Sequence, residues 1–188
     1  SGADANTIIS SPWLGTGTVT IEGNTTTPGN VILAGTSADG TIFITSGRLN
    51  ITGVRVQGTV AVAVSGAGRL NIGAAVEFGT TTNYHIFISD QGFIWGRNNY
   101  TIVGDAGYHI VVVGPGIVDI AGITVTLSGT RAFSFYTYVD RNGTLAYHAN
   151  TISGTATGAR YLVQNGGGVF VHGAGTTYLP GNAAGTST

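Results

Sequence analysis

The sequence contains no cysteine, no methionine and little charge. Charged side chains make up 8% of its 188 residues, its seven basic residues are all arginine, and the formal net charge is −1. The missing cysteine excludes disulfide bonds and thiolate metal sites. The weak, nearly balanced charge argues against electrostatic capture of nucleic acid or of an anionic membrane. No apolar run reaches the roughly 18 residues that indicate a membrane-spanning helix, so membrane insertion is not expected.

Glycine and β-branched residues take the place of the missing charges. Glycine contributes 32 residues, and apolar residues make up 42% of the chain. Glycine and β-branched residues both disfavour helix. β-Branched residues favour strands, and glycine favours the tight turns between them. The apolar residues also recur at regular positions, which is not typical of a disordered chain. The composition therefore predicts an all-β fold.

A glycine followed by a short apolar-polar-apolar run recurs about every 24 residues. The repeats open at Gly47, Gly68, Gly92, Gly116, Gly143 and Gly168. Each period holds three short apolar stretches separated by turn-forming residues, which is the pattern of three strands and three turns. Because one repeat cannot bury its own apolar face, successive repeats must stack on one another. The sequence therefore predicts a three-sided parallel β-helix of about six to eight coils.

The regular repeats span residues 41–181 and form the predicted β-helix. Residues 1–40 hold less regular apolar stretches and are predicted to be a lead-in with irregular first coils, while residues 182–188 form a polar tail. The sequence begins with Ser1-Gly2 and contains no initiator methionine. We therefore expect a fragment of a longer protein whose first two residues remain from cloning.

The second residue after each repeat glycine is apolar and is predicted to point inward. These residues are Leu49, Leu70, Ile94, Val118, Leu145 and Phe170. Because side chains alternate along a strand, their neighbours point outward, and several of these neighbours are apolar too. A contiguous apolar strip marks an interface, and cyclic symmetry lets one patch per subunit close a homo-oligomer. The predicted interface residues are Phe87, Phe93, Val111, Ile117, Val169 and Val171. The alternative is that these side chains are scattered on the surface.

Aromatic and polar residues at outward positions indicate a candidate sugar site. Trp95 and Asp119 are predicted to be neighbours on consecutive coils, with Asn71 one coil earlier. Tyr136 and Tyr138 are expected to flank them. An aromatic ring beside carboxylate and amide groups suits the stacking and hydrogen bonding of a sugar ring. The alternative is that these aromatic residues lie in a subunit interface.

The few acidic residues form no obvious catalytic pair. Sugar hydrolysis needs two carboxyl groups roughly 5–9.5 Å apart. The predicted separation is about 15 Å for Asp90 and Asp119, and roughly 11 Å for Glu77 and Asp105. No catalytic residue is therefore predicted within one chain, although acids of two subunits can still meet between chains.

Two further pairs align on adjacent coils. Arg55 and Glu77 are predicted to form an exposed ion pair across the sheet, which contributes about 0–1 kcal/mol. His85 and His109 also align, but two imidazoles without a third ligand make a weak metal site. We expect a simple histidine stack, with no metal and no cofactor.

The C-terminal repeats resemble those of phage and prophage tail-fibre and tailspike proteins. The resemblance rests on residues 158–168 (GARYLVQNGGG) and 177–182 (TYLPGN), and on coils that end in Gly or Asn-Gly. It implies a right-handed parallel β-helix, a homotrimer, a place in the tail appendage of a virion and recognition of host cell-surface polysaccharide.

This resemblance leaves three functions open. The first is a structural or host-attachment segment of a tail fibre. The second is a hydrolase or lyase that degrades capsule or lipopolysaccharide, which requires an acid pair formed between subunits. The third is an adhesin or autotransporter passenger on the bacterial cell surface with the same solenoid.

Overall fold

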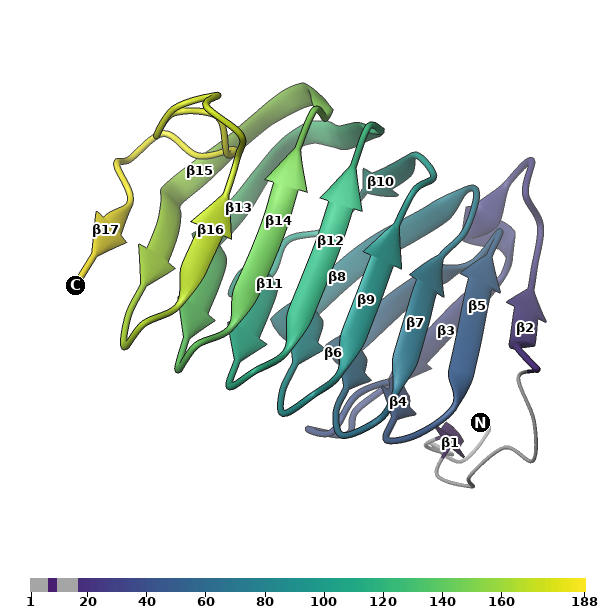
Figure 1. Ribbon diagram of the computed structural model, residues 1–188. Helices are drawn as coiled ribbons and strands as arrows, with labels where there is room; N and C mark the ends of the chain where they lie inside the picture. The colour runs from purple at the N-terminus through teal and green to yellow at the C-terminus, as the bar shows by residue number, and fades with distance from the viewer. Residues whose placement is uncertain (1–6, 10–16) are drawn as a thin grey trace.

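The computed structural model describes residues 7–9 and 17–188, in which parallel strands stack coil upon coil into a rod (Figure 1). The rod is a β-solenoid of about six turns, which confirms the predicted fold class. Residues 1–6 and 10–16 of the predicted lead-in lie outside the described residues. In the remainder of the lead-in, β2 (Val19–Glu22) and β3 (Ile32–Gly35) pair with strands of the regular repeats, and η1 (Pro28–Asn30) forms a short 3-10 helix between them.

The first side of the rod is a seven-stranded parallel sheet built from the strands that follow the repeat glycines. In spatial order after β2 come β5 (Arg48–Thr52), β7 (Arg69–Ile72), β9 (Phe93–Gly96), β12 (Ile117–Ala121), β14 (Thr144–His148) and β16 (Gly168–Phe170). Each strand pairs with its equivalent one coil later, so equivalent residues of successive repeats lie in columns.

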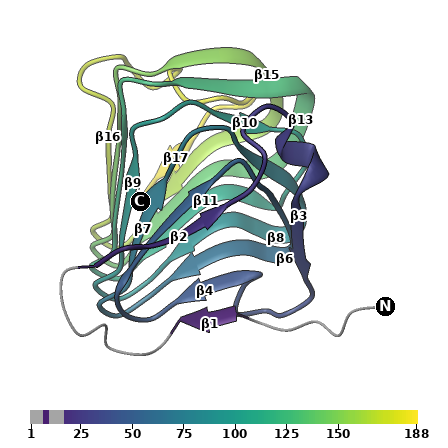
Figure 2. The ribbon, with the colours of Figure 1, turned by 90° about the vertical axis from the view of Figure 1, so that its right-hand side faces the viewer.

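The second and third sides belong to one ten-stranded sheet because four long strands continue around the corner between them. These strands are β6 (Arg55–Val64), β8 (Val76–Ile88), β13 (Thr124–Asp140) and β15 (Thr151–Val163). Two shorter strands, β3 and β10 (Tyr100–Ile102), complete the second side. Four shorter strands complete the third side, namely β1 (Thr7–Ile9), β4 (Ile42–Ile44), β11 (Tyr108–Val113) and β17 (Thr186–Ser187). Register shifts within the β6–β8 and β13–β15 pairs mark the corner. Figure 2, which looks along the rod, shows the sides around the core.

The predicted inward column forms the core of the first side over five consecutive coils. Leu49, Leu70, Ile94, Val118 and Leu145 are each at most 1% exposed. Burial of one such side chain stabilises the fold by about 1.5–3 kcal/mol. Because each of them contacts the coils before and after it, this stabilisation exists only when the repeats are stacked.

The last coil departs from the predicted register by one residue. Leu145 of β14 pairs with Val169 of β16, so Val169 continues the inward column, and Phe170 points outward with 53% of its surface exposed. The prediction that Val169 and Val171 face outward is therefore wrong. Both valines line an apolar hollow of about 490 Å³ at the end of the rod.

A run of three glycines explains this error. In the preceding coil the backbone N–H of Gly143 donates to Asp140 O, and in the last coil the N–H of Gly167 donates in the same way to Gln164 O. Gly167 is therefore the equivalent repeat glycine, not Gly168. Because side chains alternate along a strand, a shift of one residue reverses the direction of every side chain that follows.

Candidate glycan-binding face

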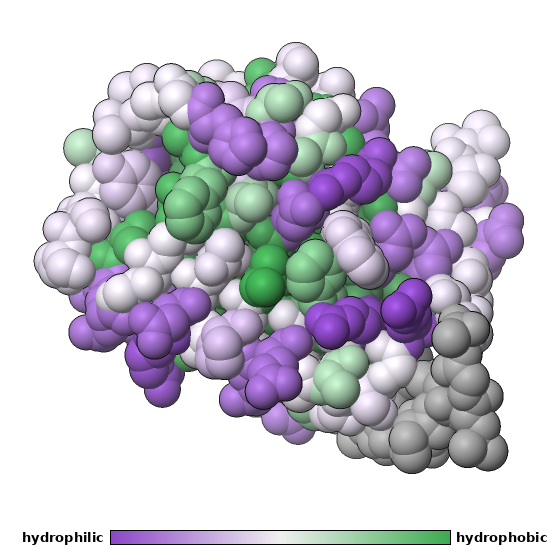
Figure 3. Space-filling view, in the orientation of Figure 1, coloured by the Kyte–Doolittle hydropathy of each residue, from purple (hydrophilic) through white to green (hydrophobic). Residues whose placement is uncertain are grey.

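The outer surface of the seven-stranded sheet carries two columns of side chains, and we call it the seven-stranded face. One column contains Arg48, Arg69, Phe93, Ile117 and Thr144, and the other contains Thr20, Asn50, Asn71, Trp95, Asp119 and Ala146. Figure 3 looks onto this face and shows hydrophilic side chains beside apolar ones on its surface. The face therefore presents polar and aromatic groups at the regular spacing of the coils.

Trp95 lies between Asn71 and Asp119 on this face, as the sequence predicts. Trp95 pairs with Asn71 on one neighbouring strand and with Asp119 on the other. Its side chain is exposed, at 37% of its surface, and its ring centroid lies 4.4 Å from that of Phe93. The two ring planes are inclined at 64°, so the rings meet edge to face, and Phe93 supports the exposed Trp95 ring from one side. We call this pair the aromatic platform.

A shallow groove of about 430 Å³ lies beside this platform. It is lined by Thr18, Thr20, Arg48, Leu49, Asn50, Arg69, Leu70, Asn71 and Trp95. Within it, the side-chain amide of Asn71 donates to Asn50 Oδ1 at 2.6 Å. This bond fixes the orientation of both amides, and each keeps further donor or acceptor capacity for a ligand.

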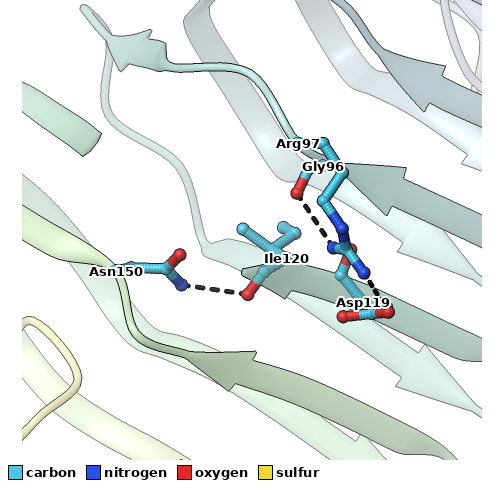
Figure 4. Close-up of polar contacts among 5 residues, drawn as sticks. All are labelled: Gly96, Arg97, Asp119, Ile120 and Asn150. Atoms are coloured by element: carbon cyan, nitrogen blue, oxygen red, sulfur yellow. Dashed lines mark hydrogen bonds and ion pairs between the residues drawn. The ribbon is translucent and has the colours of Figure 1, made fainter. Parts of the chain in front are cut away.

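Arg97 is a residue of this face that the sequence analysis missed. Its guanidinium forms an ion pair with Asp119 Oδ2 and donates to the carbonyl oxygens of Gly96 and Asp119 (Figure 4). The pair neutralises the carboxylate and holds it against the sheet. The signal was present, because Arg97 follows Trp95 by two residues and alternation directs both side chains to the same face.

Tyr136 and Tyr138 do not flank Trp95, so this part of the predicted site is wrong. Tyr136 is fully buried, and its hydroxyl oxygen lies 3.0 Å from that of Tyr147 inside the core. Tyr138 is half-buried and belongs to the third side, where β13 pairs with β11 and β15. The whole of β13 belongs to the ten-stranded sheet, so both tyrosines lie on a different sheet from Trp95.

The predicted interface residues lie on different sides of the rod. Phe93 and Ile117 are neighbours on the seven-stranded face, and Ile117 is 39% exposed. Phe87 and Val111 lie on the third side, where Val111 is only 2% exposed. With Val169 and Val171 in the terminal hollow, these residues do not form the single contiguous strip that the sequence predicts.

The third side carries a different aromatic cluster, which we call the aromatic strip. It consists of the half-buried side chains of Tyr84, Phe87, Tyr108, Phe135 and Tyr138. Neighbouring rings have centroids between 5.6 and 6.0 Å apart, within the range of favourable aromatic pairs. These rings extend over three successive coils on β8, β11 and β13.

His85 and His109 form a buried polar chain, as the predicted histidine stack implies. Their Nδ1 atoms lie 3.1 Å apart; His85 Nε2 lies 2.9 Å from Gly79 O, and the Tyr100 hydroxyl lies 2.9 Å from His109 Nε2. Since a carbonyl can only accept, His85 Nε2 carries the proton and His85 Nδ1 accepts from His109. Burial lowers the pKa of His85 to about 3 and the pKa of His109 well below its usual value. Both imidazoles are therefore neutral.

Four of the acidic residues lie within 4 Å of an arginine. The pairs are Glu77–Arg55 at 2.7 Å, Asp105–Arg131 at 3.8 Å, Asp119–Arg97, and Asp140–Arg141 at 3.1 Å. The first confirms the predicted Arg55–Glu77 contact. A hydrogen bond from the Asn165 amide lowers the pKa of Asp140. In residues 7–9 and 17–188, no three histidine or acidic side chains gather in the way that a metal ion requires.

The chain matches no protein-family model, and no curated protein or solved structure is significantly similar to it. Among the described residues, no helix is both long and apolar enough to cross a membrane.

Proposed function

We propose that the chain is a glycan-binding segment of an attachment protein and that the seven-stranded face is its binding surface. The observation that carries this proposal is the exposed ring of Trp95, held in register between the amide of Asn71 and the carboxylate of Asp119. Sugar rings bind by stacking an apolar face on an aromatic ring while their hydroxyls form hydrogen bonds with nearby polar groups.

The construction of the face favours binding over a role in packing alone. Trp95 and Phe93 form the platform, and the adjacent groove presents the two amides of Asn50 and Asn71. These side chains project from paired strands of a rigid sheet, not from loops. Little conformational freedom is therefore lost when a ligand binds, which favours affinity.

The proposed biological setting is a phage tail fibre or tailspike that attaches to host surface polysaccharide. The solenoid form and the resemblance of residues 158–168 and 177–182 to tail-fibre repeats support this setting. A bacterial surface adhesin with the same solenoid is the alternative. The sequence of the full-length gene product separates the two, because an adhesin requires a secretion signal and an outer-membrane anchor.

We also propose that the rods associate, with homotrimers as the expected form. The aromatic strip on the third side is the surface that favours this, because its rings lie in mutual contact and remain half-exposed. Sedimentation at micromolar concentration tests the proposal, and a purely monomeric protein would contradict it.

The binding proposal is tested with a glycan array that compares the wild type with Trp95→Ala. We expect the substitution to weaken binding about tenfold or more, since an aromatic anchor typically contributes at least about 2 kcal/mol. Phe170→Ala is the matched control, because Phe170 is also an exposed aromatic residue on the outer surface of the same sheet but lies at the far end of the rod. Equal binding by all three proteins would refute the assignment of this face.

The same polysaccharides test the attachment role against degradation. A protein that only attaches leaves the polymer intact, so no new reducing or unsaturated ends are expected after prolonged incubation. Release of such ends would favour the alternative of a hydrolase or lyase with a site between subunits.

A further inference from the structure

Two arginines lie side by side on the seven-stranded face, and no acidic residue in the described part of the chain pairs with either of them. Arg48 of β5 and Arg69 of β7 occupy directly paired positions on neighbouring strands, which run about 4.8 Å apart. Like charges in such positions destabilise a sheet. Among the described residues, neither arginine has a carboxylate oxygen within 4 Å. The fold therefore holds two uncompensated positive charges together at a cost in stability.

The other five arginines of the chain have partners within the protein. Arg55, Arg97, Arg131 and Arg141 each pair with an acidic residue, and Arg160 donates to the backbone carbonyl of Ala183. Each of these five arginines therefore has a polar partner in the protein, although Nε of Arg131 and Nε of Arg160 are buried without a hydrogen bond. A destabilising contact such as the like-charge pair of Arg48 and Arg69 is expected at a functional site, where a bound ligand supplies the missing charge partner. Arg48 and Arg69 are therefore the arginines of the described residues whose guanidinium groups have the most capacity left for an external anion.

The surroundings of Arg48 and Arg69 leave their hydrogen-bonding edges available. Arg48 is exposed, and the guanidinium carbon of Arg69 lies 5.4 Å from the centroid of the Phe93 ring. Contact with a ring uses the flat face of a guanidinium and leaves its N–H edge free. That edge is a planar fork that binds two oxygens of a carboxylate or phosphate at once. Both arginines line the groove beside Trp95.

We propose that the ligand of this face is an acidic glycan, whose oxyanion binds between Arg48 and Arg69 while a sugar ring stacks on Trp95. This inference rests on the proposed glycan-binding function and adds the chemical class of the ligand. The oxyanion is a carboxylate, as in uronic acids, or a phosphate within the polymer. Nucleic acid fits less well, because two cations on a chain of net charge −1 provide no extended track for a phosphate backbone.

The experiment measures binding to acidic polymers and to their neutralised counterparts. Polygalacturonate and hyaluronan are each compared with their carboxyl-reduced form, and a phosphomannan is compared with its dephosphorylated form. The proteins are the wild type, Arg48→Gln/Arg69→Gln, Trp95→Ala, and Arg141→Gln as a control with an exposed arginine outside the groove. Binding is measured at two salt concentrations, and single-stranded DNA is added as a competitor.

We expect the wild type to prefer an acidic polymer to its neutralised form, and which pair shows the preference identifies the oxyanion. The double variant should lose about a hundredfold in affinity for the acidic form, since one hydrogen bond to a charged group contributes about tenfold. It should also unfold at a temperature no lower than the wild type, because the like-charge pair has been removed. Arg141→Gln should bind like the wild type.

The outcomes separate this inference from the function on which it rests. Equal binding to acidic and neutralised forms, with loss in Trp95→Ala, would overturn the acidic ligand and leave glycan binding in place. Binding that persists in Trp95→Ala and is fully competed by DNA would overturn both. Binding to neutral glycans on the array but to none of the acidic polymers would also overturn the inference.

Discussion

The buried histidines make the stability of this fold depend on pH. The pKa of His85 falls from 6.5 to about 3 on folding because burial removes the imidazole from water, an effect that the hydrogen bond to Gly79 O only partly offsets. The unfolded chain therefore takes up a proton near pH 6.5, whereas the folded chain stays unprotonated down to about pH 3. Between these values the unfolded state binds more protons, so stability falls as the pH falls.

The size of the effect follows from this shift. Each pH unit below 6.5 lowers the free energy of unfolding by about 1.4 kcal/mol for one such group. At pH 4.5 the contribution of His85 is therefore a loss of about 3 kcal/mol relative to pH 7. His109 adds to the loss in the same direction, because its pKa is also lowered by burial. A loss of this size is a large part of the stability of an ordinary domain.

Urea unfolding at several values between pH 7 and pH 4.5 measures this loss. Asp and Glu begin to titrate at the lower end of this range, so the contribution of His85 is taken from the comparison of the wild type with a His85 variant. His85→Leu should be less stable at pH 7, because Gly79 O and His109 lose a partner, but its stability should depend less steeply on pH. The control is Ile86→Ala, which also destabilises the core beside His85 but removes no titratable group, and it should keep the wild-type slope. A free energy of unfolding that changes by less than about 1 kcal/mol over this range would refute the reasoning.

Two further predictions test the close approach of coils and the register of the last coil. A Cβ on Gly158, which has φ +98°, would lie 1.7 Å from Phe133 O, so Gly158→Ala should destabilise the fold by several kcal/mol; Gly122→Ala, at φ +69° with no atom within 4 Å, should cost about 1 kcal/mol. Similar losses for the two variants in thermal unfolding would contradict this packing. Val169→Ser should lower the unfolding temperature more than Phe170→Ser, because Val169 continues the inward column; the reverse order would favour the register that the glycine pattern predicts.

The fold could be predicted from the sequence because each coil repeats the same constraint. Stacking places equivalent residues of successive coils above one another. Leu49, Leu70 and Ile94 therefore indicate one buried column, even though the sequence of any single coil would not predict it. The columns also fixed the outward order of Asn71, Trp95 and Asp119, since alternation leaves no freedom within a short strand. Prediction failed in the last coil, where three consecutive glycines offer no side chain to fix the register.

The rest of the candidate site depends on features that a linear pattern does not contain. Tyr136 and Tyr138 follow the period of the repeat, but β13 continues around a corner, and this places one of them in the core and the other on the third side. Arg97 lies just beyond the end of β9, so alternation from Trp95 indicates its face, but no strand pairing extends to it that would indicate its partner. The ion pair of Arg97 with Asp119 joins two successive coils, and the repeat pattern does not indicate which side chains meet between coils beyond the paired strands.

The solenoid separates the residues that hold the fold together from those that are free to bind a ligand. Inward columns are constrained by every neighbouring coil, whereas outward columns need only remain compatible with the strand. An outward column can therefore contain neighbouring residues that lower the stability of the fold, such as Arg48 beside Arg69. Because the same face also presents Trp95 and two amides in register, the charge conflict and the aromatic platform belong to one surface. The proposed acidic glycan would account for both, with its oxyanion between the arginines and a sugar ring on Trp95.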